Sequence, residues 1–142
     1  MPSQKEWDDV IRVLSGTYGY VNMVIDGYDV SVERGLSGKN TLSNVIWING
    51  EAGGKYMVFH LEGEKVVLPE VTRRFYRKCK KNLYTLKHRQ RADKELGKRA
   101  ALKGGFHKKI IFYSYFWNSA AALRRHLLKN NEDIKITKIL GA

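Results

Sequence analysis

The residues best suited to chemistry are Lys and Arg side chains gathered between Arg73 and Lys109. This stretch holds 15 of the 26 Lys and Arg residues and, in Asp93 and Glu95, only 2 of the 14 acids. The rest of the chain is close to neutral, so the formal charge of +12 comes from this stretch. Arg grips phosphate oxygens through paired hydrogen bonds, and Lys attracts them as a point charge. The stretch therefore predicts a surface that binds a polyanion.

We expect the contacts to come from basic side chains of this stretch: Arg73, Arg74, Arg77, Lys78, Lys80, Lys81, Lys87, Arg89, Arg91, Lys98, Arg99, Lys103, Lys108 and Lys109. The bland alternative is a solvated surface without a partner, but such surfaces normally mix both signs of charge. No zinc-finger spacing, heptad zipper or helix-turn-helix pattern encodes base readout. DNA, RNA, a host ribonucleoprotein and an acidic protein groove all remain open as partners.

Catalytic signals are weak by comparison. Glu62, Glu64 and Lys65 form the one carboxylate–lysine set that resembles a metal-dependent nuclease, and they fall at a predicted turn. Cys79 is the only cysteine, which excludes an internal disulfide and a thiolate zinc cluster, and we expect it to pack rather than react. The histidines share no metal-ligand spacing: His60, His88, His107 and His126. We predict no catalytic residue, no metal site and no cofactor.

The N-terminal half predicts a helix and a β-meander. A capping box at Ser3 and Glu6 opens a helix that reaches Leu14. The turn Asp26–Gly27 predicts a hairpin between two alternating segments. The predicted strands are Tyr20–Ile25, Tyr28–Arg34, Leu42–Ile48 and, after a turn at Asn49–Gly50 or Gly53–Gly54, Lys55–His60.

The C-terminal half predicts the helices that would present the basic residues. A helix over Pro69–Leu83 would turn Val71, Phe75 and Cys79 inward, and a second helix would run from a Thr85 cap to Leu102. The other predicted elements are a strand over Ile110–Trp117, a helix over Ser119–Lys129 and a last short strand over Ile134–Ile139. The aromatic run Phe112–Trp117 could stack bases, but a core strand explains it better.

These elements predict an α+β fold. We expect a single domain over residues 1–142, with a sheet-forming half at 1–68 and a basic helical half at 69–142. The longest apolar run is too short to span a bilayer, and the N-terminus lacks a signal-peptide core. The expected location is therefore the cytoplasm, with no membrane partner.

Three segments in order carry a family resemblance: Val45–Gly50 followed by Gly54–Tyr56, then Arg73–Tyr76, then Leu96–Ala101. This order resembles small accessory proteins encoded by bacteriophages and prophages. The resemblance implies a protein that acts in the host cytoplasm by binding. Such proteins redirect host machinery or block host defences, including CRISPR effectors. The resemblance assigns no catalytic residue to this chain.

The sequence therefore predicts a non-enzymatic binding protein that contacts nucleic-acid phosphates or a host complex containing nucleic acid. One alternative is a protein-only inhibitor that fills an acidic groove of a host enzyme. The other is a metal-dependent nuclease.

Prolonged incubation with labelled DNA or RNA and Mg²⁺ should leave the nucleic acid intact, because no motif supplies a nucleophile or a metal site. Gel electrophoresis of the products checks this. Cleavage that disappears in Glu62→Gln or Glu64→Gln would establish the nuclease alternative.

Overall fold

The computed structural model describes residues 1–36, 39–53 and 55–141. The fold is α+β, as predicted, with 33% helix and 36% strand. The chain forms two compact units. We call residues 1–57, 68–77 and 114–142 the sheet unit, and residues 58–67 and 78–113 the basic unit.

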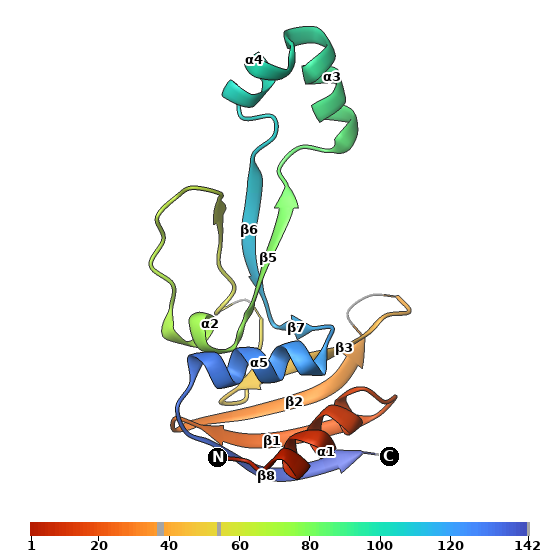
Figure 1. Ribbon diagram of the computed structural model, residues 1–142, viewed down its shortest axis with the longest axis vertical. Helices are drawn as coiled ribbons and strands as arrows, with labels where there is room; N and C mark the ends of the chain where they lie inside the picture. The colour runs from red at the N-terminus through yellow and green to blue at the C-terminus, as the bar shows by residue number, and fades with distance from the viewer. Residues whose placement is uncertain (37–38, 54, 142) are drawn as a thin grey trace. The chain divides into compact units, whose positions relative to one another are not determined.

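The sheet unit is built on five strands in the order β7-β3-β2-β1-β8, with antiparallel neighbours (Figure 1). Its strands are β1 (Gly19–Ile25), β2 (Tyr28–Leu36), β3 (Leu42–Ile48), β7 (Phe116–Trp117) and β8 (Ile134–Gly141). Its helices are α1 (Gln4–Leu14), α2 (Glu70–Phe75) and α5 (Ala120–Asn130).

Local signals that were read from the sequence are confirmed at several element ends. The Ser3 hydroxyl accepts from the Glu6 N–H, and the Glu6 carboxylate accepts from the Ser3 N–H, each at 3.2 Å. Asp26 and Gly27 adopt φ angles of 46° and 87°, as a tight β1–β2 hairpin requires. Thr85 and Ser119 cap the helices that follow them.

The core of the sheet unit follows from strand alternation. Val30 and Val32 on β2 are buried, and between and beside them stand the more exposed Asp29, Ser31 and Glu33. Helix α1 contacts β1, β8 and α5, and its apolar side is buried. Each element hides one apolar face, so the layers assemble by burying those faces together.

The prediction of a fourth strand in the meander is wrong. Within Lys55–His60 only the end is a strand: β4 (Phe59–Leu61) pairs with β6 (Lys109–Ser114) in the basic unit. Gly54, in one of the two predicted turns, lies outside the described residues. The remaining places in the five-stranded sheet are taken by β7 and β8 from the C-terminal half. Sheet edges accept any strand of suitable register, and sequence order does not choose among them.

The basic unit holds a second sheet, in the order β4-β6-β5, and the helices α3 (Leu86–Leu96) and α4 (Lys98–Lys103). The predicted helix over Pro69–Leu83 ends at Phe75, and β5 (Arg77–Asn82) follows. Cys79 is buried between the exposed Lys78 and Lys80, so burial alternates from residue to residue here, as it does in a strand. Val71, Phe75 and Cys79 are all buried, as predicted, although they do not share a helix.

The predicted helix over Thr85–Leu102 is broken at Gly97. This residue has φ 81° and ψ 151°, a backbone region that is open almost only to glycine. The break lets α3 and α4 contact each other and bury Ala92 and Ala101. A continuous helix would have left this thin apolar stripe exposed.

The predicted strand over Ile110–Trp117 is divided at Tyr115 into β6 and β7, which belong to different sheets. Tyr113 and Trp117 are buried, and the Trp117 indole donates to the Phe75 carbonyl at 3.0 Å. The core interpretation is therefore confirmed for Tyr113 and Trp117, whereas Phe112, Tyr115 and Phe116 are half-buried.

Across the described ranges, every helix is too short or too polar to cross a lipid bilayer.

Two phenylalanines allow a matched test of the core. Phe75 is fully buried, with 0% exposure, whereas Phe59 is 77% exposed. We expect Phe75→Ala to lower the free energy of unfolding by about 3–5 kcal/mol, because it leaves a cavity. Phe59→Ala should change it by less than about 0.5 kcal/mol. Urea unfolding of both variants measures this, and equal losses would contradict the assigned core.

Candidate nucleic-acid interface

The predicted basic surface is concentrated in the basic unit. This unit carries thirteen Lys and Arg against four Asp and Glu, a formal charge of +9. Eleven of the fourteen predicted contact residues belong to it, all exposed except the half-buried Arg89: Lys78, Lys80, Lys81, Lys87, Arg89, Arg91, Lys98, Arg99, Lys103, Lys108 and Lys109. The sequence prediction left out two further exposed lysines, Lys65 and Lys94.

Few of these cations are neutralised inside the unit. Lys80 pairs with Glu62 at 3.1 Å, and Arg91 pairs with Glu95 at 3.0 Å. The other eleven Lys and Arg form no ion pair with any residue that the structure describes. The unit therefore presents uncompensated positive charge, which attracts anions and repels itself.

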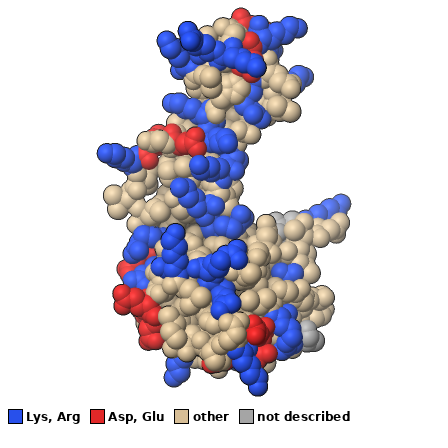
Figure 2. Space-filling view, viewed as in Figure 1, with Lys and Arg blue, Asp and Glu red and all other residues tan. Residues whose placement is uncertain are grey.

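The helices carry much of this charge at their surface. On α3, Lys87, Arg91 and Lys94 follow one another at spacings of four and three residues, which places them on one side. On α4, Lys98, Arg99 and Lys103 are all exposed. Figure 2 shows Lys and Arg gathered over these helices, at the top of the view.

The strands that lead to and from the helices continue the basic surface. Lys78 and Lys80 are exposed on β5, and the Lys81 ammonium lies 5.5 Å from the centre of the Phe112 ring. Lys108 directly precedes β6 and Lys109 begins it, and the Leu83 N–H donates to the Lys108 carbonyl at 3.1 Å.

A shallow apolar recess opens within this surface and was not predicted. Its volume is about 220 Å³, and it is lined by Tyr84, His88, Arg91, Ala92, Glu95, Leu96 and Phe106. The Tyr84 and Phe106 rings form its aromatic wall, with centroids 5.2 Å apart. Its lining on α3 recurs every three or four residues. That periodicity was visible in the sequence, but Phe106 joins it only through the fold.

The recess is held by contacts around its edge. His107 Nε2 lies 2.7 Å from Asp93 Oδ1 on α3, and the Phe106 N–H donates to the Ala101 carbonyl at 3.1 Å. The first contact joins the segment after α4 to α3, and the second joins it to α4, so the segment that carries Phe106 is held in place.

The other three predicted contact residues belong to the sheet unit. Arg73 is exposed. Arg77 is half-buried, and its Nε donates to the Phe116 carbonyl at 2.9 Å. The Arg74 side chain is only 20% exposed and is engaged by other residues of the protein.

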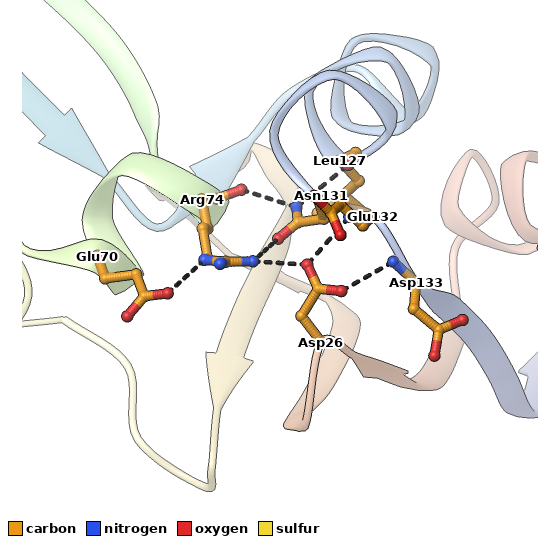
Figure 3. Close-up of polar contacts among 7 residues, drawn as sticks. All are labelled: Asp26, Glu70, Arg74, Leu127, Asn131, Glu132 and Asp133. Atoms are coloured by element: carbon orange, nitrogen blue, oxygen red, sulfur yellow. Dashed lines mark hydrogen bonds and ion pairs between the residues drawn. The ribbon is translucent and has the colours of Figure 1, made fainter.

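Arg74 is the centre of an ionic clamp (Figure 3). Its Nε donates to Glu70 at 2.8 Å, and one terminal nitrogen donates to Asp26 at 2.6 Å and to Asn131 at 3.1 Å. The Asn131 amide donates in return to the Arg74 carbonyl at 3.3 Å and to the Leu127 carbonyl at 3.1 Å. The guanidinium thereby joins α2 to the β1–β2 turn and to the end of α5.

Asp26 completes the clamp from the turn. Its carboxylate accepts from the Glu132 N–H at 3.0 Å and from the Asp133 N–H at 2.8 Å. These backbone donors, together with Arg74, lower the pKa of Asp26 below its ordinary value of 3.8. The stabilisation is therefore present above about pH 4 and is lost as the pH falls through the lowered pKa.

Two of the candidate catalytic residues, Glu62 and Cys79, have other surroundings in the structure. Among residues 1–36, 39–53 and 55–141, no three His, Cys, Asp or Glu side chains converge as a possible metal site. Glu62 is engaged with Lys80, and Cys79 is buried. Burial lowers the pKa of His126, which packs against Trp117, so this imidazole is neutral at pH 7.

Comparison of the chain with protein-family models, curated proteins and solved structures finds no match.

The adjacent residues Arg73 and Arg74 allow a test of whether the ionic clamp stabilises the fold. We expect Arg74→Gln to lower the free energy of unfolding by about 1–2 kcal/mol, because Glu70 and Asp26 lose their charged partner. Arg73→Gln, an identical change one residue away at an exposed side chain, should be nearly neutral. Thermal melting of both variants at pH 7 tests this. Equal melting temperatures would show that the clamp is not stabilising.

Proposed function

We propose that this chain binds nucleic-acid phosphates, free or within a host complex, through the basic unit. The observation that carries the proposal is the set of eleven Lys and Arg that form no ion pair with any described residue, in a unit that holds only four acids. Such a surface is stabilised when phosphates replace its counterions. Neutralisation of about five phosphates would make duplex binding strongly dependent on salt.

The binding surface in this proposal excludes Arg74. Its guanidinium donates to two carboxylates, so a phosphate would have to displace Asp26 or Glu70. The proposed contacts are the exposed cations of α3, α4 and the adjoining strands. Each contacts the backbone of the nucleic acid, which supplies affinity without base sequence.

The setting that fits this proposal comes from the sequence resemblance to phage accessory proteins. A small basic protein that occupies the nucleic-acid path of a host complex would block that complex without catalysis. A CRISPR effector is one such target, and the host cytoplasm is the corresponding location.

A protein-only inhibitor is a second candidate, supported by leucines among the cations. Leu86, Leu96 and Leu102 are more than half exposed on α3 and α4. A groove with acidic walls and an apolar floor would cover both kinds of side chain. Binding that survives nuclease treatment of the target complex would favour this candidate over contact with nucleic acid.

Charge reversal on α4 tests the proposed surface. The triple variant Lys98→Glu, Arg99→Glu, Lys103→Glu should weaken duplex binding at least tenfold, because three attractions become repulsions. For the unaltered protein, log K should fall with log salt at a slope of roughly −4 to −5. The triple variant should flatten that slope. Fluorescence anisotropy with labelled DNA and RNA measures both quantities.

A matched reversal in the sheet unit controls for net charge. Lys129→Glu, Lys135→Glu, Lys138→Glu changes the total charge equally at exposed positions. It should retain most of the affinity. Equal losses in the two triple variants would mean that total charge, and not the basic unit, governs binding. Absence of binding at low salt would remove the proposal.

A further inference from the structure

We infer that the recess beside α3 takes an unstacked nucleobase, so that the basic unit prefers single-stranded or looped nucleic acid to a plain duplex. This inference rests on the proposed function and adds a base-dependent contact to it. Three features of the recess carry it: its aromatic wall, its polar rim and the cations beside it.

The aromatic wall offers a surface for stacking. Tyr84 and Phe106 lie 5.2 Å apart and line a recess of about 220 Å³ that is mostly apolar. Base–aromatic stacking is the general means by which proteins hold unpaired bases. The bond between His107 and Asp93 fixes the segment that carries Phe106, so little ordering is required on binding.

The polar rim favours a base over an apolar side chain. Arg91, Glu95 and His88 border the recess, and Arg91 uses only its Nε to hold Glu95. An occupant that excludes water from these groups must return hydrogen bonds to them. The edge of a base carries donors and acceptors for a guanidinium, a carboxylate and an imidazole. A leucine or phenylalanine from a protein partner carries none.

Charge next to the recess matches the phosphates that accompany a base. Lys87 and Lys94 stand on the same side of α3 as Arg91, four residues before it and three after it. Both are exposed and form no ion pair within the part of the chain that the structure describes. Glu95 opposes a phosphate, and its pairing with Arg91 reduces that repulsion. Bases inside a duplex cannot reach the wall, because their faces are stacked.

The test compares a single-stranded oligonucleotide with an abasic one of equal length and charge, using the full chain and fluorescence anisotropy. We expect the base-containing strand to bind about tenfold more tightly at the same salt concentration. A strand carrying 2-aminopurine should also lose fluorescence on binding, as the base stacks on the aromatic wall.

Variants locate the contact. Tyr84→Leu removes a ring from the recess and should abolish the preference for bases while leaving affinity for the abasic strand unchanged. Tyr18→Leu, at an exposed tyrosine of the sheet unit, should alter neither quantity. If Tyr84→Leu does not fold, the comparison of the two strands on the unaltered protein still decides the question.

Two outcomes overturn the inference in distinguishable ways. Equal, salt-dependent binding of both strands removes the base contact and leaves the proposed function standing. Binding of neither strand, with binding of poly-glutamate instead, removes both and favours an acidic protein partner.

Discussion

The sheet unit depends on one guanidinium that meets two carboxylates and an amide. Arg74 links Glu70, Asp26 and Asn131, which come from segments far apart in the sequence. A partly buried cation is costly without partners, so each of these contacts favours the same arrangement of the three segments. The clamp also secures the start of β8, since Asp26 accepts two backbone N–H groups immediately before that strand.

The basic unit is held together by weaker means. Its helices bury little beyond Ala92 and Ala101, and its ion pairs at Lys80 and Arg91 are exposed, where such pairs contribute little. Self-repulsion among the remaining cations opposes this small core. This charge is unfavourable for folding, and the proposed polyanionic partner would give it a physical role.

Elements whose ends are set by local sequence motifs could be predicted. Features that depend on contacts between residues far apart in the sequence could not. The capping box at Ser3 and the turn at Asp26 are each determined by a few neighbouring residues, and the structure confirms both. Arg73 and Arg74 look identical in sequence, yet only the fold brings Asp26 to one of them. The recess escaped prediction for the same reason, because Phe106 reaches α3 only after Gly97 breaks the helix.

The division into two units separates the source of stability from the proposed source of binding. A ligand stabilises the state that it binds, and the gain grows with its concentration relative to Kd. Phosphates that neutralise the basic unit would relieve the repulsion that opposes its folding. The sheet unit already has a core, and the charges of its clamp are paired with each other. The same phosphates would therefore add little to its stability. The proposed binding would therefore be coupled to folding where the core is small, and the larger core would be free of that coupling.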